Sequence, residues 1–600
     1  MKVGLYVWAA AALFGETRFE QIDPAEIEIQ GEIGRRIDLA VRKNFLALDL
    51  DGAFLQPFRQ RKPKEEAKTQ QDRFRGLGLQ IHAAVLYARY TKDPQVIARK
   101  NHLVEETLKT QSPSGYIGLF KEEPDASHLW EEWAFHDAAY IVFGLAEDYR
   151  CFGNRGSLDA ARKLARYLMT NWPQRPKEPN FTTVGAAEAF FSLYDLTREK
   201  EYLRFAADEP MGKQYRIVPA PLISWQQELH PVRKVTSSQG AVRAESCHMY
   251  RIMERAMMQL RLNRIEPREN LPLMSRRLIS AMTRAAKPGM LITGAIGRQE
   301  GWHEDQGGSG RAGETCATVY EMWFLDELAR HDGDLRYGDM MERAFYNAFL
   351  AAQDPEGRRI RYFTPFSGKR EYFEFDAFCC PNNFRRGMGS LPKLIYHRAG
   401  GGLAINLYIA SRAKVELGGG RSIEVEQQTA YPVSGDVAII LRPAAPARFP
   451  LRLRIPRWCA EAAVTVNNEA AAKVRPGVPY HQIEREWRPG DKVKLHMSMP
   501  VRFVKGRELQ QGRAAVMRGP VVYCLNPGKN PAIQGLDLRE IILDPGSIKA
   551  STPDGRTLTI RASKPAGLPV VLTEFPDSGG EEIYFLLSDP AAAVDDEFLM

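Results

Sequence analysis

The sequence predicts a helical domain followed by one or more β-sandwich modules, and two changes of pattern support this prediction. From about residue 34 to 350, apolar residues recur at helical spacing. After about residue 400, apolar and polar residues alternate and Gly and Pro interrupt the runs, which is typical of short strands. The chain has 600 residues, several times the length of an average domain, so more than one folded unit is expected.

Short polar turns of one recurring style separate the segments of the helical part. Helix starts follow residues 91–94 (TKDP), 153–156 (GNRG), 197–200 (TREK) and 331–334 (HDGD). The spacing of these turns fits pairs of helices better than a solenoid repeat of about 34 residues. Paired helices of this length commonly close into a toroid, and we expect one over residues 16–399.

Strand-like runs fill most of the chain after residue 400. They lie at residues 403–408, 423–427, 437–441, 451–455, 492–497 and 516–523. Six or more short strands without intervening helices predict a β-sandwich over residues 400–526. Residues 527–600 contain more Pro, Gly and Asp and a strand-like run at 568–573, so we expect a β-rich C-terminal appendage there.

Composition and charge exclude several classes of protein. A hydrophobic content of 44% with 26% charged residues rules out a globally disordered chain. The net charge of +8 is spread without a block of Lys and Arg, so no nucleic-acid partner is expected. No apolar run reaches the 18 or more residues of a membrane-spanning helix. The sequence is silent on oligomeric state, and a homodimer is one option.

The apolar run at residues 3–14 follows Lys2 and has two readings. One is a short secretory signal peptide over residues 1–15, although Leu13 and Phe14 stand where a cleavage site favours small residues. The other is an N-terminal β-strand that packs on a later domain. A periplasmic or secreted location therefore agrees with the sequence as well as a cytoplasmic one.

One carboxylate and three thiols stand out as a candidate metal site. Glu314 and Cys316 lie in the first turn of a predicted helix, and Cys379 and Cys380 are adjacent further along the chain, where Pro381 and two asparagines predict a turn. Zinc binds Cys sulfur and Glu oxygen in tetrahedral geometry. The spacing by itself is also consistent with buried free cysteines, with a Cys379–Cys380 disulfide, with a purely structural zinc, and with coincidence.

Several motifs around these residues carry a resemblance to a known family. They are residues 313–317 (GETCA), 342–347 (ERAFYN), 379–385 (CCPNNFR), 453–458 (LRIPRW) and 516–523 (VMRGPVVY). In this order they resemble glycoside hydrolase family 127, the β-L-arabinofuranosidases, over about residues 75–525. The resemblance implies an (α/α)6 barrel followed by β-sandwich modules, a small-molecule or oligosaccharide substrate, and Zn²⁺ held by Glu314, Cys316, Cys379 and Cys380.

The same resemblance assigns the catalytic roles. Cys379 would be the nucleophile of a retaining exo-glycosidase, because a zinc-held thiolate stays charged at neutral pH and aimed at a sugar C1. The family places its acid/base glutamate after a Gly-x-Ile-Gly turn, which is residues 294–297 (GAIG) in this chain. Glu300 fits that place best, and Glu304 remains the alternative because the loop is shorter here.

The resemblance also points to residues that contact the sugar. Glu342 would accept hydrogen bonds from hydroxyls, Tyr362 would lie near the nucleophile, and His136 would be a pocket histidine. Trp302 could stack on a sugar face. These four residues are the expected substrate-binding set.

The chain departs from the family in its histidines, and this leaves the substrate open. Thr183 and Gly240 stand where two of three pocket histidines are expected, which changes the hydroxyl that can be bound or the room for the sugar. Sugar, ring form and linkage therefore stay undetermined. Two other functions remain open: a non-catalytic carbohydrate-binding or scaffold protein with a structural zinc, and a helical-toroid lyase or unsaturated-uronide hydrolase.

Overall fold

The computed structural model describes residues 18–176, 184–207, 248–269, 271–467, 469–470, 472–550, 552 and 555–599, and the backbone of two further strands at 233–236 and 242–245. The predicted signal or strand at residues 1–15 lies outside the described residues, as do Thr183 and Gly240. The chain divides into two compact units, each built from several stretches. One contains residues up to 30, 325–340 and 392–499, and the other contains residues 31–324, 341–391 and 500–600.

Helices dominate residues 31–390, as the apolar periodicity predicts. They are α1 Gly31–Leu39, α2 Gln56–Gln60, α3 Gln70–Arg73, α4 Leu77–Thr91, α5 Pro94–Lys109, α6 Ala134–Phe152, α7 Arg155–Asn171, α8 Ala186–Thr197, α9 Lys200–Ala207, α12 Met249–Ile265, α13 Leu273–Met282, α14 Thr315–Asp332, α15 Tyr337–Ala344 and α16 Cys379–Ser390.

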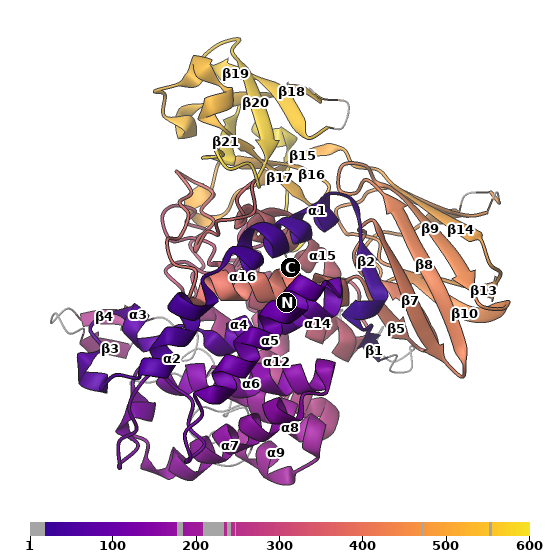
Figure 1. Ribbon diagram of the computed structural model, residues 1–600. Coiled ribbons are helices and arrows are strands. Elements are labelled where there is room, and N and C mark those ends of the chain that lie inside the picture. The colour runs from indigo at the N-terminus through magenta and orange to yellow at the C-terminus, as the bar shows by residue number, and fades with distance from the viewer. Residues whose placement is uncertain are drawn as a thin grey trace. The chain divides into compact units, whose positions relative to one another are not determined.

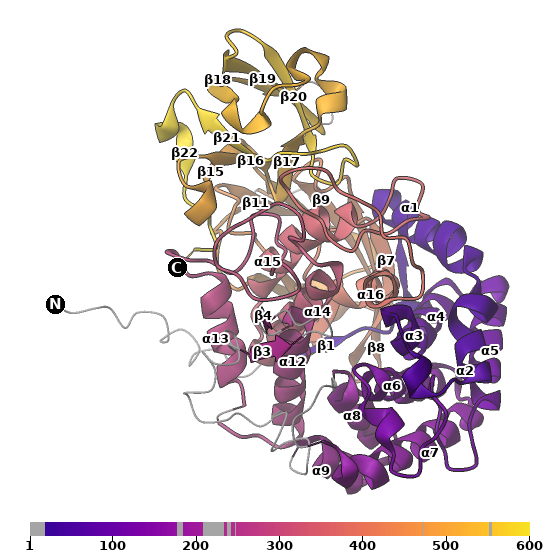
Figure 2. The ribbon, with the colours of Figure 1, turned by 90° about the vertical axis from the view of Figure 1, so that its left-hand side faces the viewer.

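Burial separates these helices into an inner and an outer layer. α4, α6, α8, α12, α14 and α16 are buried along almost their whole length, whereas α5, α7, α9 and α13 bury one face. Figure 2 shows the inner helices following one another around a ring, with α5 and α7 outside α4 and α6. The predicted fold class, a helical domain followed by β-sheet domains, is confirmed.

The recurring turns have a shared backbone basis. Each of the four places one residue in the left-handed region, with φ of 53° at Lys92, 69° at Gly153, 61° at Arg198 and 67° at Gly333. A left-handed residue directly after a helix lets its N–H bond a carbonyl of the last turn and ends the helix. The turns therefore end one helix and start the next within a few residues.

Two sheets make up most of the unit that contains residues 392–499 (Figure 1). The five-stranded sheet has the order β1-β5-β6-β10-β13 and the seven-stranded sheet the order β12-β11-β14-β9-β8-β7-β2. β7 alternates strictly between buried and exposed residues, so its sheet presents one face to the interior. The N-terminal strands β1 and β2 pair antiparallel with β5 and β7.

The strands of these two sheets are short. They are β1 Phe19–Gln21, β2 Ile27–Ile29, β5 Tyr396–Ala399, β6 Gly402–Ile405, β7 Ser411–Gly418, β8 Arg421–Thr429, β9 Asp436–Pro443, β10 Ala447–Leu453, β11 Ala462–Val466, β12 Ala472–Val474, β13 His481–Trp487 and β14 Asp491–Met497. A separate hairpin of β3 Arg233–Thr236 and β4 Val242–Glu245 lies within the helical part.

A third sheet of eight strands belongs to the same unit as the helices. Its strands are β15 Val501–Lys505, β16 Ala514–Arg518, β17 Val521–Leu525, β18 Ile542–Ala550, β19 Thr557–Lys564, β20 Pro569–Glu574, β21 Tyr584–Leu587 and β22 Ala593–Val594. The prediction of one strand over residues 516–523 is wrong. Gly519, at φ 55°, and Pro520 turn the chain there, so that β16 and β17 pair as a hairpin.

Candidate active site

A tight hairpin presents Glu300. The backbone N–H groups of Arg298 and Gly301 each donate to the other residue's carbonyl, both at 3.0 Å, which closes a two-residue turn. Gln299 and Glu300 occupy the turn with φ of 51° and 66°. Such turns favour Asn and Gly, and two larger residues there cost conformational energy that the surroundings must supply. The turn therefore holds Glu300 at its tip in a backbone conformation that glutamate rarely adopts.

Neighbouring segments fix this hairpin in place. Gln299 N–H donates to the carbonyl of Arg311 at 2.8 Å, and Met249 N–H donates to the carbonyl of Glu300 at 2.9 Å. On the other side of residues 311–314, Thr315 N–H donates to the carbonyl of Tyr362 at 2.9 Å. The hairpin, the segment before α14 and the loop at residues 361–364 therefore run side by side, although they are far apart in sequence.

Tyr362 lies between two of the predicted catalytic residues. Its hydroxyl donates to Glu300 Oε1 at 2.6 Å and lies 3.3 Å from Cys379 Sγ. Glu304 instead accepts a hydrogen bond from the Trp302 indole Nε1 at 3.1 Å. The structure thus brings Glu300, rather than Glu304, to the hydroxyl that contacts Cys379.

The four predicted metal ligands form one buried cluster. Glu314, Cys316 and Cys380 have no exposed surface and Cys379 is 8% exposed. One ligand atom from each residue lies within 4.8 Å of the others. Cys380 Sγ is 3.1 Å from Cys316 Sγ and 3.7 Å from Glu314 Oε1. The structure therefore brings the four predicted ligands together.

The local structure at the cysteine pair differs from the prediction of a turn. Cys379 and Cys380 are the first two residues of α16, and Phe378 precedes them in extended conformation. Pro381 fits there because residues in the first turn of a helix need no N–H donor. The proline and the asparagines thus mark a helix start, and the prediction of a turn is wrong.

The chemistry of the cluster fits a metal ion. Burial raises the pKa of the Glu314 carboxyl and of the Cys316 and Cys380 thiols well above their usual ranges. Glu314 Oε2 is buried and receives no hydrogen bond. A divalent cation would neutralise such groups as they ionise, and zinc accepts both Cys sulfur and Glu oxygen as ligands. The cluster can therefore bind a metal ion.

Cys379 differs electrostatically from its two partners. Burial alone raises the pKa of its thiol, but hydrogen bonds with Cys316, Cys380 and Tyr362 outweigh burial and hold the pKa of Cys379 well below its usual range. A thiolate is the nucleophilic form of cysteine. The surroundings of Cys379 therefore favour the thiolate form more than those of Cys316 and Cys380 do.

His248 is a site residue that the sequence analysis missed. It directly precedes α12, with Nε2 3.5 Å from Glu300 Oε2 and Nδ1 3.8 Å from Glu314 Oε2. The histidine therefore lies between the hairpin carboxylate and the cluster carboxylate. A histidine immediately before an apolar helical segment was the available signal, but it matched no motif.

The remaining predicted binding residues occupy different surroundings. His136 is buried on α6, with Nε2 3.4 Å from the Tyr250 hydroxyl, and burial lowers its pKa to about 3, so the ring is neutral. Glu342 is fully buried on α15. The Trp302 indole is 2% exposed and occupies the space beside the Gly289 Cα. The sugar-binding roles of His136, Glu342 and Trp302 stay predictions.

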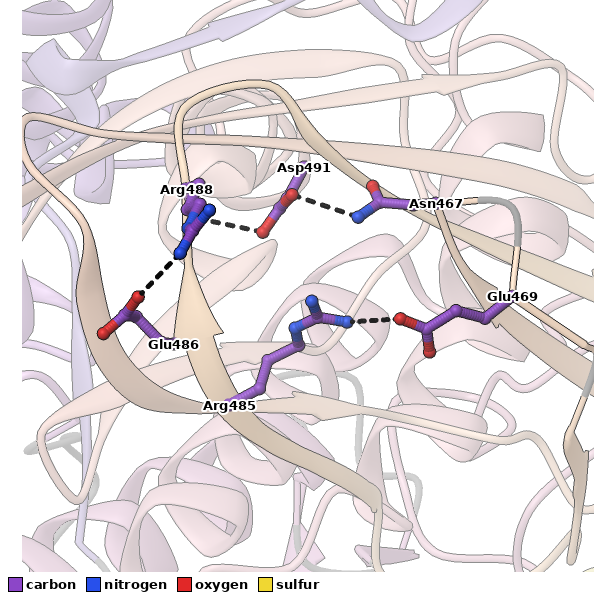
Figure 3. Close-up of a pocket in the computed structure, with 6 residues that line it drawn as sticks. All are labelled: Asn467, Glu469, Arg485, Glu486, Arg488 and Asp491. Atoms are coloured by element: carbon purple, nitrogen blue, oxygen red, sulfur yellow. Dashed lines mark hydrogen bonds and ion pairs between the residues drawn. The ribbon is translucent and has the colours of Figure 1, made fainter.

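A separate pocket lies in the unit that holds the two sheets (Figure 3). It is lined by Asn467, Glu469, Arg485, Glu486, Arg488 and Asp491. Arg485 pairs with Glu469 at 3.1 Å, Arg488 with Glu486 at 3.6 Å, and Asn467 donates to Asp491 at 3.1 Å. The charged groups of this pocket pair with one another, and its lining contains no cysteine or histidine. It therefore lacks the nucleophilic thiol of the Cys379 site.

Comparison with known proteins identifies the family. Residues 45–393 match the β-L-arabinofuranosidase GH127 catalytic domain, and residues 402–499 match the GH127 middle domain. The non-reducing end β-L-arabinofuranosidase of Bifidobacterium longum subsp. longum is 24% identical over 527 residues, which is 77% of each chain.

Two solved structures share the fold. The GH127 β-L-arabinofuranosidase of Geobacillus stearothermophilus T6 has a TM-score of 0.75 at 22% identity and covers 94% of this chain and 100% of its own. A GH127 β-arabinofuranosidase has a TM-score of 0.76 at 22% identity and covers 96% and 99%. Among the described residues, no helix is long and apolar enough to cross a membrane. Since the catalytic-domain match alone spans more than half of the sequence, this chain belongs to glycoside hydrolase family 127 and is a glycoside hydrolase.

Proposed function

We propose that this enzyme is a zinc-dependent, retaining β-L-arabinofuranosidase that removes a terminal sugar, with Cys379 as nucleophile and Glu300 as acid/base. One observation carries the proposal: a single hydroxyl, that of Tyr362, contacts both Cys379 Sγ and the Glu300 carboxylate. Retaining glycosidases need a nucleophile and a proton donor close together at the glycosidic bond. The substrate class follows the family and the activity of the relative from Bifidobacterium.

The reaction divides into two displacements at the anomeric carbon. In the first, Cys379 Sγ attacks C1, the C–S bond forms as the glycosidic C–O bond breaks, and Glu300 gives its proton to the departing oxygen. In the second, Glu300 takes a proton from water, the water oxygen bonds to C1, and the C–S bond breaks. The anomeric configuration is inverted twice and therefore retained.

The Tyr362 hydroxyl contacts both reacting groups, which must differ in protonation. It donates its proton to Glu300 Oε1, and its oxygen lies 3.3 Å from Cys379 Sγ. The first displacement begins from a thiolate on Cys379 and a protonated carboxyl on Glu300. Once the Glu300 carboxyl is protonated, the hydroxyl can donate to the Cys379 thiolate instead.

Glu314, Cys316, Cys379 and Cys380 would hold the zinc ion. When bound, zinc would stabilise the ionised thiols of the cluster, including the nucleophile. The fold keeps these ligands together. Helices α14 and α16 both begin at the cluster, and the hydrogen bond from Thr315 N–H to the Tyr362 carbonyl keeps the loop at residues 361–364 against the start of α14.

The proposal is tested with p-nitrophenyl β-L-arabinofuranoside on reduced, zinc-loaded protein. The Cys379→Ser variant is expected to lose at least about a thousandfold in kcat, because serine is a far weaker nucleophile at neutral pH. Cys151→Ser is the matched control, since Cys151 lies at the end of α6 and is absent from the cluster. Full activity of Cys379→Ser on a sugar that the wild type cleaves would refute the mechanism.

A second pair of variants separates the two candidate acid/base glutamates. Glu300→Gln is expected to lose activity on substrates with poor leaving groups and to recover turnover with azide, which replaces water without needing a base. Glu304→Gln is the control and is expected to retain most activity, because Glu304 contacts the Trp302 indole instead. The reverse result would move the acid/base role to Glu304.

A further inference from the structure

Aromatic rings form a continuous line from the catalytic tyrosine to the surface. The ring of Phe373 lies 5.1 Å from that of Tyr362 and 5.4 Å from that of Phe378, and the ring of Phe375 lies 5.6 Å from that of Phe373. Phe378 directly precedes the nucleophile Cys379. We call Phe373, Phe375 and Phe378 the aromatic strip.

The strip becomes more exposed with distance from the nucleophile. Cys379 is 8% exposed, Phe373 and Phe378 are half-buried, and Phe375 is 41% exposed. Burying a phenylalanine side chain stabilises a fold by about 1.5–3 kcal/mol, so a contiguous apolar surface beside an active site is left open at a cost. Such surfaces commonly bind a ligand.

The backbone and ion pairs hold the strip in place without a ligand. Phe373 N–H donates to the carbonyl of Ile360 at 2.9 Å. Asp376 accepts two hydrogen bonds from Arg358, at 2.9 and 2.7 Å, and one from Arg385 at 3.1 Å. Bidentate pairs of this kind fix orientation as well as position. The rings are therefore presented on a preformed surface.

The reaction itself indicates what the strip would contact. The sugar that is transferred must place C1 at Cys379, next to the buried Glu314 and His248. The leaving group of an exo-acting enzyme must extend the other way, from the oxygen protonated at Glu300 towards solvent. The strip begins beside Tyr362, whose hydroxyl contacts both catalytic groups, and it ends at the exposed Phe375.

The charges along the strip restrict the ligand further. Glu371 and Glu374 are exposed and flank Phe373 in the sequence. Carboxylates near the strip repel an anionic ligand such as a uronic acid, and the guanidinium groups of Arg358 and Arg359 in the same region already pair with Asp376 and Asp354. Aromatic faces, in contrast, suit the apolar C–H face of a neutral sugar ring.

We propose that the aromatic strip binds the leaving-group half of the substrate, and that this half is a neutral sugar ring stacked on Phe373 and Phe375. The inference rests on the proposed function and adds to it a preference for oligosaccharides over simple alkyl glycosides. It assigns the specificity of the enzyme partly to residues outside the cluster of thiols and carboxylates.

The test compares two substrates that differ only in the leaving group: a β-L-arabinofuranosyl-arabinose disaccharide and methyl β-L-arabinofuranoside. The measured quantity is the ratio of kcat/KM for the disaccharide to kcat/KM for the methyl glycoside. Phe373→Ala and Phe375→Ala are each expected to lower this ratio about tenfold, which is typical for loss of one apolar contact in a binding site. Leu536→Ala is the control, since Leu536 is an apolar residue with an exposure similar to that of Phe375, at 44%, and is not part of the strip.

Three outcomes oppose the proposal and are distinguishable. If a phenylalanine variant lowers kcat/KM equally for both substrates, the ratio is unchanged and the strip contacts the transferred sugar. If the variant lowers kcat/KM for neither substrate, the strip contacts neither half of the substrate. Equal preference of the wild type for an arabinuronide and an arabinose leaving group would contradict the selection for a neutral ring. A wild type that cleaves neither glycoside refutes the proposed function, and it does so before any variant is made.

Discussion

Replacement of Tyr362 by phenylalanine tests the arrangement on which the mechanism depends. The change removes one oxygen atom and with it the 2.6 Å hydrogen bond to Glu300 and the 3.3 Å contact with Cys379 Sγ. The ring remains, and so do its contacts with Phe373 and Phe378. A hydrogen bond to an ionised group contributes about 1.5–3 kcal/mol. If that contribution is made in the transition state, kcat/KM falls about 10- to 150-fold.

The assay is kcat/KM for an aryl β-L-arabinofuranoside, with the melting temperature of each variant measured beside it. Tyr167→Phe is the matched control. The Tyr167 hydroxyl forms a hydrogen bond of 3.0 Å with His128 Nε2, and neither residue belongs to the cluster. Both variants are expected to fold, and Tyr362→Phe alone is expected to lose activity. A loss below threefold in Tyr362→Phe would show that the hydroxyl does not support either catalytic group, and the reasoning from the two contacts would be wrong.

Three further predictions concern the metal and the barrel core. Cys380→Ala is expected to lower bound zinc from one ion to none per chain, measured by metal analysis, and to lower the melting temperature as chelation does. Asn383 Nδ2 donates to Cys316 Sγ at 3.2 Å, so Asn383→Ala is expected to weaken zinc binding 10- to 100-fold in competition with a coloured chelator, and equal affinity would contradict that role. Burial, and secondarily the charge on Glu188, raises the pKa of Glu254 to about 8. Because the folded protein keeps a proton that the unfolded chain loses above its usual pKa near 4.5, stability falls as pH rises towards 8. Glu254→Gln is therefore expected to melt higher relative to wild type at about pH 8.5 than at about pH 5, and an equal difference at both pH values would oppose this assignment.

Periodicity predicted the helical part well because the outer helices α5, α7, α9 and α13 each bury only one face. It failed where two elements share one apolar run. Residues 516–523 are apolar on both sides of Gly519 and Pro520, and only those two residues indicated the hairpin of β16 and β17. The pairing of β1 with β5 and β2 with β7 joins segments more than 370 residues apart, and local pattern carries no information about such partners.

Some residues of the candidate site could be predicted from the sequence, and others could not. The family resemblance pointed to the thiols and Glu314, whereas their spacing alone was also consistent with buried free cysteines or a disulfide. The position of Glu300 beside the Tyr362 hydroxyl needed the structure, since the hairpin turn at Gln299 and Glu300 uses residues that turn statistics disfavour. The line of rings from Tyr362 was likewise hidden, because Tyr362 and Phe373 belong to different segments that only the fold places side by side.

The helix starts explain how thiols would serve both the proposed metal binding and the proposed catalysis. Cys316 is the second residue of α14, and Cys379 and Cys380 are the first two of α16. The positive end of a helix dipole stabilises negative charge and lowers the pKa of a thiol. Asn383 adds a donor to Cys316, and its amide is oriented by Arg386, whose Nη1 donates to Asn383 Oδ1 at 2.8 Å. The inner helices α14 and α16 therefore also supply electrostatic support for ionised sulfur, so a disruption of either helix start is expected to weaken the proposed metal site and the proposed nucleophile together.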